Sequence, residues 1–117
     1  MKRKSIQLND ILESINKIET YTKGIDFDSF CFNEMMFDAV VRNLEIIGEA
    51  ARNTPDEIKI KYPDIPWRQM IGVRNILIHE YFGIDNTIIW QIIKTNLPEI
   101  KPIIIKALHE EGDIEVC

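Results

Sequence analysis

The chain has 117 residues, 45% hydrophobic and 28% charged, which is typical of one globular domain. Its net charge of −5 argues against a protein that coats nucleic acid with a broad basic surface, so any such contact has to be local. No apolar run reaches the roughly 18 residues of a membrane span, and polar residues near Met1 argue against a secretory signal. Cys31 and Cys117 do not form a disulfide framework. We therefore expect one cytoplasmic domain over residues 1–117, with its core at about 7–108.

Two long helices are predicted from apolar residues that recur at helical spacing in the first half of the chain. The first includes residues 11–18 and ends near Gly24, which suits a C-cap. The second is expected to be capped by Asp28 or Ser29 and to run for about four turns. Gly48 lies within its apolar stripe, which predicts a close contact with another helix.

Two shorter helical segments follow. Residues 54–57, Thr-Pro-Asp-Glu, are typical of a capping box that opens a short connecting helix, which must end before Pro63. Pro66 can start the next helix, whose apolar stripe continues to Tyr81, just before Gly83.

The last long helix is expected to be capped by Asp85 or Asn86 and keeps helical periodicity across Pro98 and Pro102. Because a proline inside a helix costs about 3 kcal/mol, this segment is either one kinked helix or two pieces, and we favour the kink. No strand-like alternation occurs. The sequence therefore predicts an all-α fold, an up-and-down four-helix bundle with a short extra connecting helix and a proline-kinked last helix.

Residues 72–81, Gly-Val-Arg-Asn-Ile-Leu-Ile-His-Glu-Tyr, place four polar groups in an otherwise apolar segment. A guanidinium can neutralise phosphate oxygens and an imidazole can move protons near neutral pH. On a helix Asn75 and His79 share a face, but Arg74 and His79 are about 140° apart. Either the Arg74 side chain wraps around, or the helix loosens before Gly83, or a second copy completes the site across a two-fold axis, which we favour.

A structural role for this segment stays open. Arg74 and His79 near a helix C-terminus can interact with the helix dipole, with Glu80 or Asp85 as partners for Arg74. Tyr81 can be an amphipathic residue at the edge of the core. Spacing alone does not separate this role from a catalytic one.

The arginine, the four intervening residues, the histidine and the tyrosine two positions later resemble the signature of the HEPN superfamily, in particular its HepT-like branch. Residues 39–50 and 67–72 are also similar to that branch, so the resemblance covers about residues 7–108. It implies a HEPN-like fold and a ribonuclease that needs no metal or other cofactor. It further implies that this ribonuclease is the toxin of a HepT/MntA-type (type VII-like) toxin-antitoxin pair and acts on RNA as a homodimer.

The resemblance also assigns roles to individual residues. It implies that Arg74 and His79 are catalytic, that Asn75 supports them, and that Tyr81 receives AMP from a nucleotidyltransferase antitoxin that silences the toxin. A second hypothesis is that the protein is a non-catalytic helical partner that presents Tyr81 or a groove to the nucleotidyltransferase. The acidic net charge slightly favours this alternative, whereas the intact set of motif residues favours the nuclease.

Overall fold

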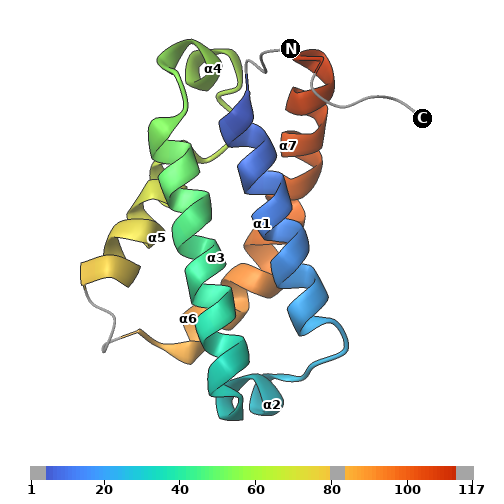
Figure 1. Ribbon diagram of the computed structural model, residues 1–117, viewed down its shortest axis with the longest axis vertical. Helices are drawn as coiled ribbons and strands as arrows, with labels where there is room; N and C mark the ends of the chain where they lie inside the picture. The colour runs from blue at the N-terminus through green and yellow to red at the C-terminus, as the bar shows by residue number, and fades with distance from the viewer. Residues whose placement is uncertain (1–4, 80–83, 113–117) are drawn as a thin grey trace.

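A computed structural model of the protein describes residues 5–79 and 84–112, and within these ranges the backbone is helical apart from short connections and contains no strand. Four long helical segments pack side by side (Figure 1): α1 (Ile6–Thr22), α3 (Glu34–Asn53), α5 (Trp67–His79) and the run of α6 (Asn86–Gln91), η2 (Ile92–Asn96) and α7 (Leu97–Glu110). The all-α bundle predicted from the sequence is confirmed. Among the described helices, none combines the length and the apolar character that crossing a bilayer requires.

Helix α3 organises the bundle, because it packs against α1 on one side and against α5 on the other (Figure 1). Helix α1 in turn packs against α7. Each helix turns an apolar stripe inward, as its 3.6-residue period requires. The fully buried side chains at the centre come from all the long segments: Leu8, Ile11, Ile15, Ile18, Val40, Leu77, Ile89, Ile104 and Leu108.

The expected second helix is divided in two. A short helix, α2 (Phe27–Phe32), precedes α3, and each has its own cap. The Asp26 carboxylate accepts a hydrogen bond of 2.8 Å from the backbone N–H of Ser29, and the Asn33 side chain accepts one of 2.9 Å from that of Met36. The predicted caps Asp28 and Ser29 are therefore wrong, because Asp26 precedes the first turn of α2 and its carboxylate accepts a hydrogen bond from a free N–H of that turn.

The connecting helix α4 (Asp56–Lys61) ends before Pro63, as predicted. The predicted capping box is wrong. The Thr54 hydroxyl donates a hydrogen bond of 2.8 Å back to the carbonyl of Ala50 in the preceding helix, so it does not cap α4. The residue that follows α4, Tyr62, donates a hydrogen bond of 2.6 Å to Glu111, which fastens this connection to the end of α7.

The last segment stays helical from α6 to α7 in spite of its prolines, and it changes direction between them (Figure 1). The turn just before Pro98 is the π-helical segment η2. A π turn widens the helix locally and accommodates a missing backbone donor. One kinked helix, as favoured from the sequence, describes this segment better than two separate pieces.

Candidate functional site

The site predicted from the sequence lies on α5, which approaches α3 closely at Gly48. A Cβ atom built on Gly48 would lie 2.1 Å from the Cβ of Arg74 and 2.8 Å from the carbonyl oxygen of Met70. Real Cβ atoms do not come so near, so only glycine permits this packing. The close helix contact predicted at Gly48 is confirmed, and its partner is the stem of Arg74.

The guanidinium of Arg74 is held from two sides and its side chain is only 19% exposed. Its Nε lies 2.9 Å from Oε2 of Glu49 on α3, an ion pair in which the N–H is not aimed at the oxygen. Its Nη1 donates a hydrogen bond of 2.9 Å to the side-chain oxygen of Asn75. The ion pair thus differs from the pairing with Asp85 considered above, and Glu80, the other residue considered, lies outside the described residues.

Glu49 is the site residue that the motif did not indicate. Its two carboxylate oxygens have different neighbours: Oε2 faces Arg74, whereas Oε1 lies 3.9 Å from Arg52 and accepts a 3.4 Å hydrogen bond from Asn53, both on its own helix. Its neighbour in sequence, Gly48, was the available signal, because a residue beside a close helix contact is well placed to reach across it.

His79 is the last residue of α5 and its side chain is exposed, as is that of Asn75. Helix α5 is regular from Arg74 to His79, so no loosening brings these two side chains together within that stretch. An α-helix separates them by about 140° around its axis and about 7.5 Å along it. Tyr81 lies outside the described residues. One chain thus pairs Arg74 with Asn75 and leaves His79 facing solvent.

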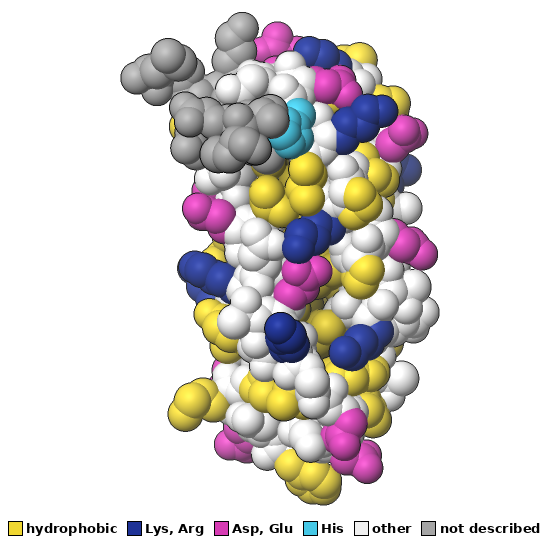
Figure 2. All heavy atoms as spheres, turned by 90° about the vertical axis from the view of Figure 1, so that its right-hand side faces the viewer, with side chains coloured by type: hydrophobic (Ala, Val, Ile, Leu, Met, Phe, Trp, Pro, Cys, Tyr) yellow, Lys and Arg dark blue, Asp and Glu magenta, His cyan; other side chains and the backbone are white. Residues whose placement is uncertain are grey.

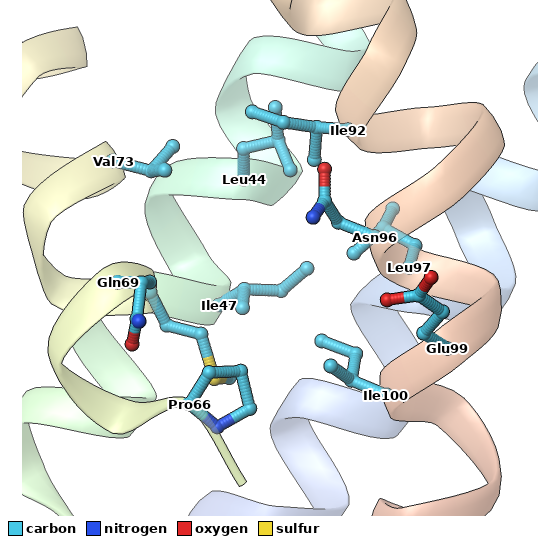
Figure 3. A pocket seen from close by; sticks show the side chains of 11 residues that line it. Leu44, Ile47, Pro66, Gln69, Val73, Ile92, Asn96, Leu97, Glu99 and Ile100 are labelled. Carbon is cyan, nitrogen blue, oxygen red and sulfur yellow. The ribbon is translucent and has the colours of Figure 1, made fainter.

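A hollow of about 310 Å³ lies on the other flank of α5, between α3 and the last helical segment (Figure 3). Its floor is apolar, with Leu44 and Ile47 from α3, and Asn96 projects into it from η2. Val73 lines this hollow, but the next residue, Arg74, turns toward Gly48. The hollow is therefore separate from the arginine and the histidine of the motif.

The surface formed by α1 and α7 carries Lys and Arg side chains interspersed with Asp and Glu (Figure 2). One cross-helix pair there, Lys101 to Glu19, has an N–O distance of 2.7 Å. The electrostatic potentials of two opposite charges this close together cancel within a few ångströms in physiological salt. This face offers no continuous basic track for a polyanion, which agrees with the acidic net charge.

Comparison with known proteins gives a family match over residues 11–107, to the family described as ribonuclease HepT-like. The putative RNase MJ1380 of Methanocaldococcus jannaschii is 51% identical over 80% of this chain and 86% of its own length. The probable ribonuclease HepT of Thermococcus cleftensis is 45% identical over 80% and 86%. The putative RNase TTE0752 of Caldanaerobacter subterraneus is 39% identical over 95% and 99%. No solved structure matches the chain.

The helical bundle and these matches place the protein in a class of small all-helical ribonucleases. The family match covers most of the chain and several relatives are well above 30% identical. The chain belongs to the ribonuclease HepT-like family.

Proposed function

We propose that the protein is a metal-independent RNA endonuclease that acts as the toxin of a type VII-like toxin-antitoxin pair. One observation carries the proposal: α5 holds the Arg74 guanidinium in a fixed place beside Asn75 while it presents His79 to solvent. A fixed cation can stabilise charge on the phosphorane oxygens and an accessible imidazole can transfer protons, which together allow cleavage of a phosphodiester without metal.

In the proposed reaction a ribose 2'-hydroxyl attacks the adjacent phosphorus and the 5'-oxygen of the next nucleotide leaves. His79 removes the proton from the hydroxyl or supplies one to the leaving oxygen, and Arg74 stabilises the negative charge on the phosphorane oxygens. Asn75 supports this by accepting a hydrogen bond from Arg74. DNA lacks the internal nucleophile, so the proposal requires RNA as the substrate.

The proposed assembly is a homodimer in which the α5 segments of both copies lie near the two-fold axis. Its support is the geometry of α5, which keeps Arg74 and His79 on different faces of one helix. An isologous contact repeats every residue on both sides of the axis, so the arginine of one copy can meet the histidine of the other.

The proposed control is adenylylation of Tyr81 by a partner nucleotidyltransferase, the antitoxin. Its support is the resemblance of the motif, in which Tyr81 follows His79 by two positions. A bulky, negatively charged nucleotide so close to the imidazole opposes the binding of RNA by charge and by volume.

His79→Ala tests the nuclease, with His109→Ala as its matched control. Both histidines are exposed and both lie in the last turn of a helix, but His109 is on α7. General acid-base catalysis contributes about 10²- to 10⁴-fold, so we expect at least that loss of RNA cleavage in His79→Ala and none in His109→Ala. Equal cleavage by both variants contradicts the proposal.

Intact-mass measurement after co-expression with the partner tests the proposed adenylylation. We expect additions of the mass of AMP on the wild type and on Tyr21→Phe, whose tyrosine is 40% exposed on α1, and none on Tyr81→Phe, which should still cleave RNA. Modification of the wild type, together with no RNA cleavage by the unmodified protein, would favour the alternative, a non-catalytic partner of the nucleotidyltransferase, which the acidic net charge also suits.

A further inference from the structure

We infer that Glu49 is a positioning residue for Arg74, and that Gly48 and Glu49 together form a seat on α3 for this arginine. The inference deepens the proposed nuclease and rests on it. Gly48 admits the stem of Arg74, because any side chain there would occupy the place of its Cβ. Glu49 pairs with the guanidinium of Arg74, and its Oε2 lies 2.9 Å from Nε.

The seat is itself held in place. Oε1 of Glu49 accepts a hydrogen bond from Asn53 and lies near Arg52, so two groups of α3 orient the carboxylate before it meets Arg74. An oriented carboxylate restrains a guanidinium better than a freely rotating one, since less side-chain entropy is lost on pairing. Glu49 is 44% exposed in its side chain, so water weakens the pair without removing it.

The nitrogen atoms of the guanidinium have different roles. Nε lies beside the Glu49 carboxylate and Nη1 donates a hydrogen bond to Asn75, and these two contacts together restrain the group. With respect to the described residues, the N–H groups of Nη2 and the second N–H of Nη1 are then the donors that can reach a phosphate oxygen. Positioning of this kind acts on the rate of the chemical step, because misplacement of a catalytic group by about 1 Å can cost about 100-fold.

Glu49→Gln tests the inference, with Glu45→Gln as its matched control. Glu45 is also a glutamate of α3 in an ion pair, but its partner is Arg42 at 3.4 Å. We expect the kcat of RNA cleavage to fall about 10- to 100-fold in Glu49→Gln, with KM unchanged or lower, and to change less than about threefold in Glu45→Gln. A rise of kcat/KM in Glu49→Gln would overturn the inference, because Glu49 would then be competing with phosphate for Arg74.

A second measurement does not depend on cleavage. The Nε–H signal of Arg74 in a ¹⁵N NMR spectrum, assigned by its loss in Arg74→Lys, should shift in Glu49→Gln, which removes the negative charge beside it, but not in Glu45→Gln. An unchanged signal overturns the inference whether or not the protein cleaves RNA. Failure of the wild type to cleave RNA, together with the expected NMR change, would refute the nuclease and leave the seat for Arg74 standing.

Discussion

At the scale of single residues, Gly48 decides how near α3 and α5 come to each other. The two nearest atoms that a Cβ would meet are the backbone oxygen of Met70 and the Cβ of Arg74, and neither can move without moving α5. The space for the Arg74 side chain is therefore set by a residue with no side chain of its own.

Gly48→Ala should consequently lower the free energy of unfolding. Overpacking costs about 1–3 kcal/mol, and the better helix propensity of alanine offsets up to about 1 kcal/mol of it. Gly72→Ala is the control, because nothing within 4 Å would meet its Cβ, so it should stabilise α5 by up to about 1 kcal/mol. Urea unfolding of dilute protein measures both, and a Gly48→Ala variant as stable as Gly72→Ala would show that α3 and α5 do not touch as described.

The candidate site was only partly predictable from the sequence, because one of its contacts depends on the packing of two helices. Local spacing put Arg74, Asn75 and His79 forward as candidates, because helical geometry relates residues a few positions apart. It offered Glu80 or Asp85 as a partner for Arg74, whereas among the described residues Arg74 forms its ion pair with Glu49, on another helix. That pairing depends on how α3 and α5 pack, which no local pattern specifies.

At the scale of helices, Tyr62 and Glu111 join the end of α4 to the end of α7. Glu111 accepts hydrogen bonds from the Tyr62 hydroxyl at 2.6 Å and from the Lys61 ammonium at 2.7 Å. Burial of the phenol, followed by its hydrogen bond to Glu111, raises the pKa of Tyr62 well above its usual value of 10.0. The folded protein therefore keeps this proton after an unfolded chain has lost it.

This difference predicts a fall in stability at high pH. Above about pH 10 the unfolded state binds fewer protons than the folded state, so the free energy of unfolding decreases as pH rises. Tyr62→Phe should remove this part of the decrease, whereas Tyr21→Phe, on the exposed side of α1, should retain it. Urea midpoints measured from pH 9 to 11.5 compare the variants, and equal slopes for both would contradict the assigned role of Tyr62.

The helices themselves were largely predictable, and their caps were not. The helical spacing of apolar residues located all the long segments, because burial of one apolar stripe on each helix dominates its stability. The stretch from Asp26 to Asn33 contains several residues able to cap a helix, and small differences in backbone direction decide which of them does so. Thr54 shows the same competition, since its hydroxyl donates to the carbonyl of Ala50 and leaves α4 uncapped by a side chain.

At the scale of the whole molecule, the proposed dimer makes a prediction that neither residue makes alone. If each site takes Arg74 from one copy and His79 from the other, a mixed dimer of Arg74→Ala and His79→Ala chains keeps one complete site. Mixing equal amounts under exchange gives about half mixed dimers, so about a quarter of the wild-type cleavage should return.

The measurement is RNA cleavage by the two inactive variants, separately and after mixing. The control mixes Arg74→Ala with an Arg74→Ala, His79→Ala double variant, which cannot assemble a complete site and should stay inactive. Sites built within one copy would leave both mixtures inactive, and that result would refute the shared site while leaving the roles of Arg74 and His79 intact.

The π-helical segment η2 also sets the rotational orientation of α7 in the bundle. A π turn contains more residues than an α turn, so its presence determines which side of α7 faces α1. Deleting one residue from η2 would let this turn close as an α turn, whereas adding a further residue would rotate α7 by about 100° relative to α6 and turn Leu97 and Ile104 away from the core. Within this stretch an added residue should therefore be tolerated less well than a change in the identity of its exposed members, Lys94, Thr95 and Asn96.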